Sequence, residues 1–163
     1  MARRRRVAVL VDDSPGSMRA CRYGAKHLLD KDMDVMLVTA VHDSHEDLPA
    51  ASSEGERVCD HHAAQLLRCD LPPERIQKVI VVANKRRRES VADAALRGAR
   101  GADHVVCGTR GVGAARSAIL KAVGLGGVSH DVVRRSKVPV TVVPITAPVP
   151  EMITVRDGTP SRQ

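Results

Sequence analysis

The sequence predicts an α/β fold built around a five-stranded parallel sheet with helices on both faces. Apolar runs typical of buried strands alternate along the chain with segments in which apolar residues recur at helical spacing. Such alternation indicates a parallel sheet, because parallel strands must be joined by crossovers that usually contain a helix. The chain has 163 residues, of which 43% are hydrophobic, so it can bury the core of one domain.

Five apolar runs have the length and composition of strands that are buried on both faces. They cover residues 7–11, 35–41, 76–83, 104–107 and 138–143. Tyr23 is the only aromatic residue among Phe, Trp and Tyr, so the predicted core consists of aliphatic side chains.

Helical patterns fill the segments between these strands. The first helix begins at Ser14, a favoured capping residue, with Pro15 in its first turn, and it extends to about Asp30. The other helices cover residues 58–69, 91–99 and 126–137. Polar stretches predict a long irregular loop over residues 42–53 and a basic loop over residues 84–88.

These elements predict one domain over residues 1–145, with a basic arm at residues 1–6. Prolines and scattered polar residues indicate a flexible C-terminal tail over residues 146–163. No apolar run has the length of a membrane span, and none near the start suits a signal peptide, which favours the cytoplasm and excludes a membrane role.

The cysteines and histidines offer metal-binding chemistry, but their spacing does not support a metal site. Cys-x-x-Cys pairs are absent, and we interpret the four cysteines as reduced core thiols. They are Cys21, Cys59, Cys69 and Cys107. Residues 42–46 together with His61 and His62 contain zinc-ligating side chains, but their spacing matches no known zinc site, so we favour a solvated loop.

The formal net charge of +7 allows acidic small molecules or nucleic acid as partners. Two basic clusters, residues 3–6 and 85–88, could contact a nucleic acid. Because Tyr23 alone is available for stacking on bases, such binding would be nonspecific and dependent on salt. A solvated arm and a solvated loop are the favoured interpretation, and nucleic-acid binding stays an alternative.

Polar and glycine-rich segments gather at the predicted carboxyl edge of the sheet. Asp12 and Asp13 follow the first strand, whereas Gly108 and Gly111 follow the fourth. Ligands of open parallel sheets bind outside this edge, where the direction of winding reverses. A glycine loop that leads into a helix N-terminus exposes backbone N–H groups, so the sequence predicts an anionic ligand here.

Three blocks of sequence, in this order, resemble the universal stress protein family over roughly residues 6–144. The first block is Val-Leu-Val-Asp-Asp-Ser, which resembles a family strand that ends in Asp-Gly-Ser. The second is Gly-Ala-Asp-His-Val-Val-Cys-Gly-Thr-Arg-Gly, and the third begins Val-Ser-His-Asp-Val-Val-Arg-Arg-Ser. The resemblance implies a Rossmann-like sheet of the adenine nucleotide alpha hydrolase type, with strand order 3-2-1-4-5. It also implies a homodimer formed through the last strand, an edge strand that runs from Val138 to Val143.

In family members that bind ATP, a glycine is followed by two residues, a second glycine, nine residues, and a third glycine before Ser or Thr. The resemblance therefore implies ATP as ligand, accompanied by Mg²⁺, and a regulatory role in the stress response. No general base is evident, so we expect at most very slow ATP hydrolysis. The ligand-binding residues that we expect are Asp12, Asp13, Ala40, Val41, Gly108, Arg110, Gly111, Gly126, Gly127, Val128 and Ser129.

The chain departs from this pattern in the segment expected to hold the phosphates. Fourteen residues, 112–125, separate Gly111 from Gly126 in place of nine, and Gly127 stands where Ser or Thr is usual. A nucleotide-free, dimeric module for protein interaction is therefore the second functional hypothesis, and a nonspecific nucleic-acid binder is the third.

Overall fold

The computed structural model of the chain describes residues 3–42, 48–109 and 127–148. Its five strands form one parallel sheet in the order β3-β2-β1-β4-β5, which confirms the predicted fold class and strand order. The strands are β1 (Arg6–Leu10), β2 (Asp34–His42), β3 (Ile76–Ala83), β4 (His104–Gly108) and β5 (Val140–Val143).

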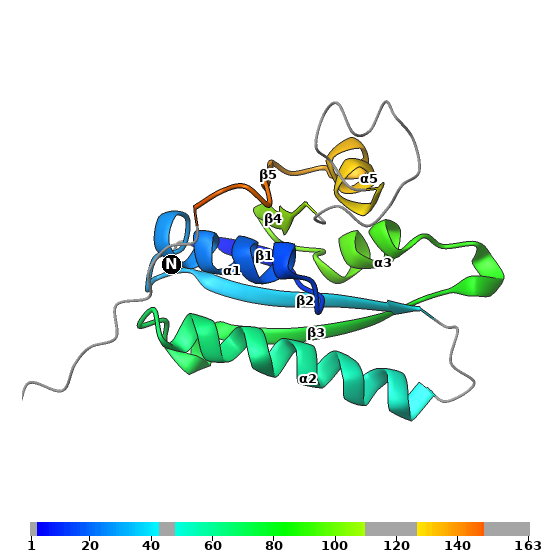
Figure 1. Cartoon of the computed structure of the whole chain (residues 1–163), viewed down its shortest axis with the longest axis horizontal. Helices are drawn as coiled ribbons and strands as arrows, with labels where there is room; N and C mark the ends of the chain where they lie inside the picture. The colour runs from blue at the N-terminus through cyan, green and yellow to red at the C-terminus, as the bar shows by residue number, and fades with distance from the viewer. Residues whose placement is uncertain (1–2, 43–47, 110–126, 149–163) are drawn as a thin grey trace, which may run out of the picture.

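Helices cover both faces of the sheet, so that the molecule has three layers (Figure 1). The helices are α1 (Pro15–His27), α2 (Leu48–Leu67), α3 (Val91–Gly98) and α5 (Gly127–Arg135), with single 3-10 turns at η1 (Pro73–Arg75) and η2 (Lys85–Arg87). Helices α1 and α2 pack against one face through one apolar cluster, whereas α3 and α5 pack against the other through a second cluster. Winding therefore reverses between β1 and β4, as expected.

Small side chains cover most of this sheet, and Tyr23 of α1 is the one residue among Phe, Trp and Tyr that packs against the core. Ala92, Ala94 and Ala95 of α3 are buried against the sheet. A Cβ atom at Gly98 would lie only 2.7 Å from Cγ1 of Val38, which shows how closely α3 approaches β2. Close packing of this kind replaces the contact area that larger side chains would supply.

The predicted loop over residues 42–53 is wrong at both ends. His42 is the last residue of β2, and α2 begins at Leu48, well before the predicted start at residue 58. Ala51, Gly55, Val58 and Cys59 are buried at helical spacing. Polar residues occupy the opposite face of the same turns, which made the segment resemble a loop. The acidic residues between 43 and 47 lie outside the described residues.

Other boundaries also differ from the prediction by one to three residues. Helix α1 ends at His27, three residues before the predicted end at Asp30. Strand β5 begins at Val140, two residues later than predicted, because the Ser136 hydroxyl bonds the main chain of Val138 and forms a turn there. The predicted basic loop 84–88 contains the 3-10 turn η2.

Candidate functional site

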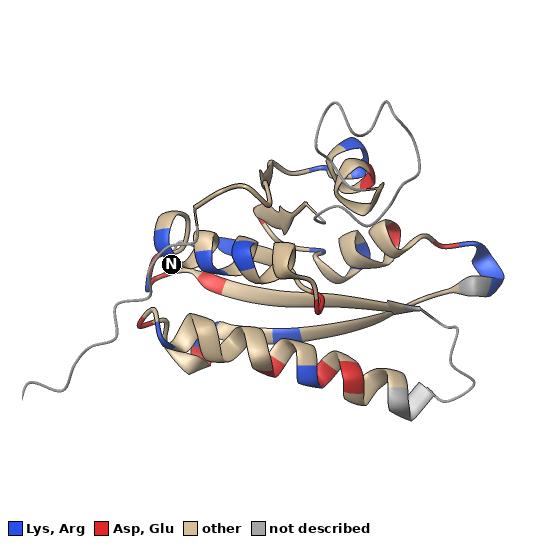
Figure 2. Cartoon of the chain, viewed as in Figure 1, with Lys and Arg blue, Asp and Glu red and all other residues tan. Residues whose placement is uncertain are grey.

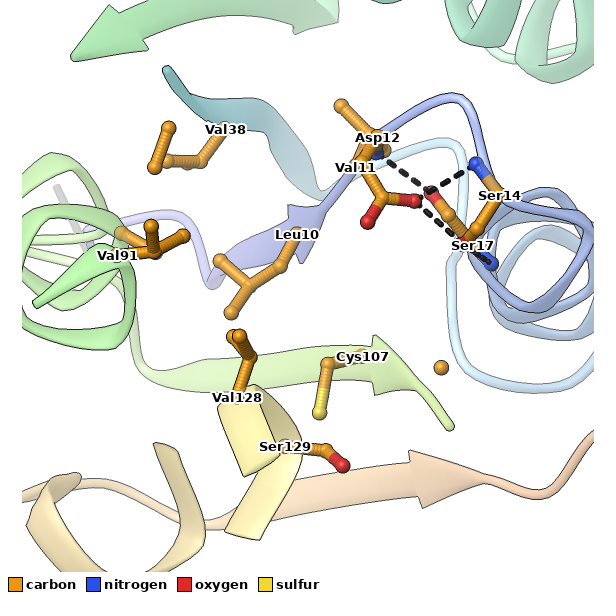
Figure 3. A pocket seen from close by; sticks show the side chains of 13 residues that line it. Leu10, Val11, Asp12, Ser14, Ser17, Val38, Val91, Cys107, Val128 and Ser129 are labelled. Atoms are coloured by element: carbon orange, nitrogen blue, oxygen red, sulfur yellow. Dashed lines mark hydrogen bonds between the residues drawn. The ribbon is translucent and has the colours of Figure 1, made fainter. Parts of the chain in front are cut away.

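A pocket of about 90 Å³ lies at the carboxyl ends of β1, β2 and β4, between the first turns of α1, α3 and α5 (Figure 3). This is the edge at which the sequence predicts a ligand. The lining residues are Leu10, Val11, Asp12, Ser14, Ser17, Val38, Ala40, Val91, Ala95, Cys107, Gly108, Val128 and Ser129.

Apolar side chains from four elements form one side of the pocket. Leu10 of β1 and Val38 of β2 face Val91, the first residue of α3, with Val128 of α5 beside them (Figure 3). The polar groups, which include Asp12 and two serines of the α1 turn, lie toward the other side. The arrangement suits a ligand with one flat apolar part and one part that forms hydrogen bonds.

The Asp12 carboxylate is held in place by the N-terminus of α1. Its Oδ1 atom accepts hydrogen bonds from the backbone N–H of Ser14 at 2.9 Å and from the Ser14 hydroxyl at 2.5 Å. The Ser14 hydroxyl in turn accepts the N–H of Ser17 at 3.2 Å as the cap of α1. The Asp12 backbone N–H donates to the Ser17 hydroxyl at 2.9 Å. These hydrogen bonds within the turn hold the carboxylate at the edge of the pocket.

Asp13 lies outside the pocket, although the sequence groups it with Asp12. Its side chain is exposed and pairs with Arg57 of α2, which also binds Glu54 at 2.6 Å. The bond to Arg57 is the main cause that lowers the pKa of Glu54. Among the other expected residues, Ala40 lines the pocket, whereas Val41 does not.

Gly108 is required for close packing of backbone against backbone. A Cβ atom at this position would lie 2.2 Å from the carbonyl oxygen of Gly16 and 3.0 Å from the backbone nitrogen of Ser17. Gly108 does not have a positive φ, so the contact with α1, and not a left-handed turn, explains the glycine. Sequence reasoning identified the position but assigned the glycine to a loop that exposes backbone N–H groups.

Thr109, which directly follows β4, is 3% exposed and is held by two hydrogen bonds. Its N–H donates to the carbonyl of Val143, and its hydroxyl accepts the N–H of Ile145 at 2.9 Å. The expected phosphate-binding residues Arg110, Gly111 and Gly126 lie outside the described residues, as does the segment 112–125.

Helix α5 brings its first turn to the pocket. Val128 and Ser129 line it, and Ser129 is 4% exposed. Gly127, the first residue of α5, is exposed and does not line it. The N-terminus of this helix supplies backbone N–H groups and the positive end of the helix dipole.

Cys107 lines the pocket, but its thiol is poorly suited to chemistry. Burial raises the pKa of Cys107 to about 11, so the reactive thiolate is scarce at neutral pH. In the described part of the chain, no group of three or more His, Cys, Asp or Glu side chains could hold a metal ion.

Sequence reasoning missed several residues of the site. The apolar residues Leu10, Val38 and Val91 appeared as core positions, and only the topology shows that they face a pocket. Ser17 was also missed, although its place three residues after the cap Ser14 is a signal that could have found it. His62, which bonds Ser17 from α2, has no signal in the sequence that separates it from an ordinary helical residue.

The family model of the universal stress protein family matches residues 3–144. The chain therefore belongs to the universal stress protein family, as its sequence blocks indicated. None of the curated protein sequences matches the chain. Within residues 3–42, 48–109 and 127–148, no helix is both long and apolar enough to cross a membrane.

Solved structures share this fold. A universal stress protein in complex with cAMP has a TM-score of 0.61 and 25% identity, over 85% of this chain and 96% of that one. A member of the family from Burkholderia pseudomallei has a TM-score of 0.60 and 23% identity, over 85% and 95%. An Arabidopsis thaliana member with AMP bound has a TM-score of 0.60 and 15% identity, over 88% and 93%.

Proposed function

We propose that this chain binds an adenine nucleotide, with ATP as its ligand, and serves as a cytoplasmic regulatory module of the stress response. The observation that carries the proposal is the pocket at the carboxyl ends of β1 and β4, which joins an apolar slot to the Asp12 carboxylate and to the N-terminus of α5. The family member with 25% identity that was crystallised with cAMP supports an adenine nucleotide as the class of ligand.

The residues of the pocket fit the parts of a nucleotide in turn. Leu10, Val38 and Val91 offer aliphatic contacts to the base, in place of the aromatic stacking that this chain lacks. The Asp12 carboxylate can accept hydrogen bonds from ribose hydroxyls. The first turn of α5 favours phosphate through its N–H groups and its dipole. Mg²⁺ enters the proposal as the counter-ion of the phosphates.

The size of the pocket sets an expectation for affinity. At about 90 Å³, it is smaller than the roughly 300–1,000 Å³ typical of pockets that enclose a whole ligand. The described residues thus suit the base and ribose, and we assign phosphate contacts to Arg110, Gly111 and Gly126. With aliphatic contacts to the base, we expect a dissociation constant on the order of micromolar.

Calorimetry with ATP, AMP and cAMP tests the proposal. We expect wild type to bind ATP, and Asp12→Asn, which keeps the shape and removes the charge, to weaken binding about tenfold, as loss of a charge-assisted hydrogen bond does. Asp13→Asn is the matched control, because Asp13 pairs with Arg57 outside the pocket and should leave ATP binding unchanged. The ranking of the three nucleotides then shows how much the additional phosphates contribute.

A folded wild type that gives no heat with millimolar ATP, AMP or cAMP would contradict nucleotide binding. The small volume of the pocket would then favour the nucleotide-free, dimeric interaction module. Mass spectrometry of small molecules released from the purified protein provides an independent check, because a bound adenine nucleotide would appear without being added.

We also propose that the protein is a homodimer formed through β5. This strand lies at one edge of the sheet. The carbonyls of Pro139 and Val143 accept bonds from β4, so the alternation of a parallel ladder directs the N–H and C=O groups of Val140 and Val142 to the outer edge. Edge groups of this kind pair readily with another strand.

A further inference from the structure

A buried histidine on α2 contacts the turn that holds Asp12. The His62 side chain is 1% exposed, and both of its ring nitrogens have partners. Nδ1 lies 2.9 Å from the carbonyl oxygen of Val58, and Nε2 lies 3.1 Å from the hydroxyl oxygen of Ser17. Because a carbonyl only accepts hydrogen bonds, Nδ1 carries the proton of the neutral ring. Nε2 is then the acceptor, and the Ser17 hydroxyl donates to it.

This tautomer fixes the direction of a chain of hydrogen bonds that ends in the pocket. The Ser17 hydroxyl donates to His62 and accepts the Asp12 N–H at 2.9 Å. The same turn holds the Asp12 carboxylate through Ser14 (Figure 3). The neutral imidazole accepts a hydrogen bond from the Ser17 hydroxyl. The Ser17 oxygen can therefore accept a hydrogen bond from the Asp12 N–H while the Ser17 proton is also paired.

We propose that His62 is a positioning residue of the pocket, and that its neutral form holds the Asp12 turn in the geometry that binds the ligand. Protonation would place a proton on Nε2, so that His62 and the Asp12 N–H both donate to the Ser17 oxygen. The Ser17 proton would then have to find another acceptor, and the turn would rearrange. This inference deepens the proposed function and rests on it for the effect on nucleotide binding.

Burial and charge around the ring decide when protonation occurs. Burial lowers the pKa of His62 below its ordinary value of 6.5, and the nearby charge of His61 acts in the same direction. Asp12 and Asp13 on the turn after β1 act in the opposite direction, as does the bond to Val58. From α1, the Cys21 thiol faces the His62 carbonyl and remains neutral, because burial raises the pKa of Cys21 to about 12.

The sign of the effect follows from this direction. Well above pH 6.5 the ring is neutral in both folded and unfolded chains, and its contribution to stability is complete. As the pH falls below 6.5, the unfolded chain takes up a proton that the folded chain resists, so the free energy of unfolding decreases. Further acidification protonates the folded ring and loosens the Asp12 turn.

A serine next to a histidine also suggests a nucleophile and its general base, but the surroundings of Ser17 favour a structural role in the Asp12 turn. Ser17 is 5% exposed, and its oxygen already accepts the Asp12 N–H. The hydroxyl is therefore committed to the turn, and its effect on the ligand passes through Asp12.

The test combines nucleotide titration with NMR between pH 5.5 and 8.0. The probe is cAMP, whose phosphodiester keeps one negative charge over this range. We expect wild type to bind more weakly as His62 becomes protonated, by up to about three- to tenfold, the effect of one neutral hydrogen bond. His62→Gln keeps a hydrogen-bond acceptor but does not titrate, so its binding should vary less with pH. His61→Gln removes an exposed neighbouring imidazole on the same helix and is the matched control. It should keep the pH dependence of the wild type, displaced toward higher pH because the charge that lowers the pKa of His62 is lost.

The NMR measurement separates this inference from the proposed function. In the free protein, the protection of the Asp12 amide against exchange, measured relative to the intrinsic exchange rate at each pH, should decrease as His62 becomes protonated. Ser17→Ala should remove this coupling. If cAMP does not bind at any pH, the proposed function fails, but the coupling between His62 and Asp12 is still measured. The inference would be overturned if protection of the Asp12 amide did not depend on the protonation state of His62. It would also be overturned if the pH dependence of cAMP binding were the same in His62→Gln as in wild type. Melting temperatures confirm that each variant is folded.

Discussion

The end of β4 and the first turn of α1 pack backbone against backbone at Gly108. Both segments line the pocket, so the contact that Gly108 permits also sets the distance between the two sides of the site. Side chains that touch a glycine can often move aside, but the carbonyl of Gly16 belongs to the backbone of α1. A substitution at this residue therefore displaces an element of the fold.

We expect Gly108→Ala to lower the free energy of unfolding by at least about 2 kcal/mol, because the new methyl group would force β4 away from α1. For a domain of this size, the melting temperature should fall by roughly 5 °C or more. Gly127→Ala is the matched control, since a Cβ atom there would meet nothing within 4 Å. Thermal denaturation of both variants measures the difference. Equal melting temperatures would show that the close contact at Gly108 does not limit the size of the side chain at this position.

At the residue scale, sequence reasoning located some of the site and missed the rest for a physical reason. Asp12 was identified because it follows a strand at the edge where parallel sheets bind ligands. Asp13 follows the same strand, but its side chain forms a salt bridge with Arg57 of α2 and points away from the pocket. His62 reaches Ser17 over 45 positions in the sequence, and only the packing of α2 on α1 brings them together.

Among the elements, α2 shows how composition can hide a helix. Residues 51–59 of α2 include Ser and Glu residues on the outer face, and four buried positions mark the inner one. The helix continues through this polar stretch because its buried face packs on the sheet. This packing outweighs the low helix propensity of the polar residues. The strands were easier to predict, since burial on both faces makes them continuous apolar runs.

The connection from β3 to α3 is held by side chains other than its arginines. The Asn84 N–H donates to Glu89 at 2.8 Å, and Asn84 accepts the N–H of Arg87 at 3.1 Å. Arg97 of α3 binds Glu89 at 2.9 Å and also the carbonyl of Val82. The bond to Arg97 is the main cause that lowers the pKa of Glu89. Figure 2 shows basic residues at this connection. Arg86, Arg87 and Arg88 are exposed.

Replacing Arg86, Arg87 and Arg88 together by Ser should therefore leave the melting temperature within about 3 °C, as exposed substitutions usually do. The three side chains are exposed, and the bonds that hold the connection do not involve them as side chains. Arg97→Ala is the contrasting variant and should lower the melting temperature further, because it removes the partner of Glu89 and of Val82. A large loss in the triple variant would show that the arginines stabilise the fold.

For the whole molecule, the topology could be predicted because strict alternation of strands and helices leaves few ways to wind a parallel sheet. The resemblance to the universal stress protein family then selected the strand order, which the structure confirms. The pocket volume could not be predicted, because it depends on how closely α3 and α5 approach the edge of the sheet. On α3, Gly98 permits the close approach, because a Cβ atom there would lie 2.7 Å from Cγ1 of Val38.

The edge strand β5 leads to the prediction for the assembled molecule. We expect light scattering to give twice the 17.5 kDa mass of the chain at tens of micromolar, the range of a moderately weak complex. Val140→Asp should give the monomer by placing a charge at the edge, where pairing would bury it. Val140 and Val142 both pack against the second apolar cluster, so a variant at either residue needs a check that it is folded. Val142→Pro supplies a second test, because it removes an N–H that faces outward and spares the ladder with β4. A wild type that is already monomeric at these concentrations would rule out the dimer, whereas folded variants that remain dimeric would move the interface away from β5.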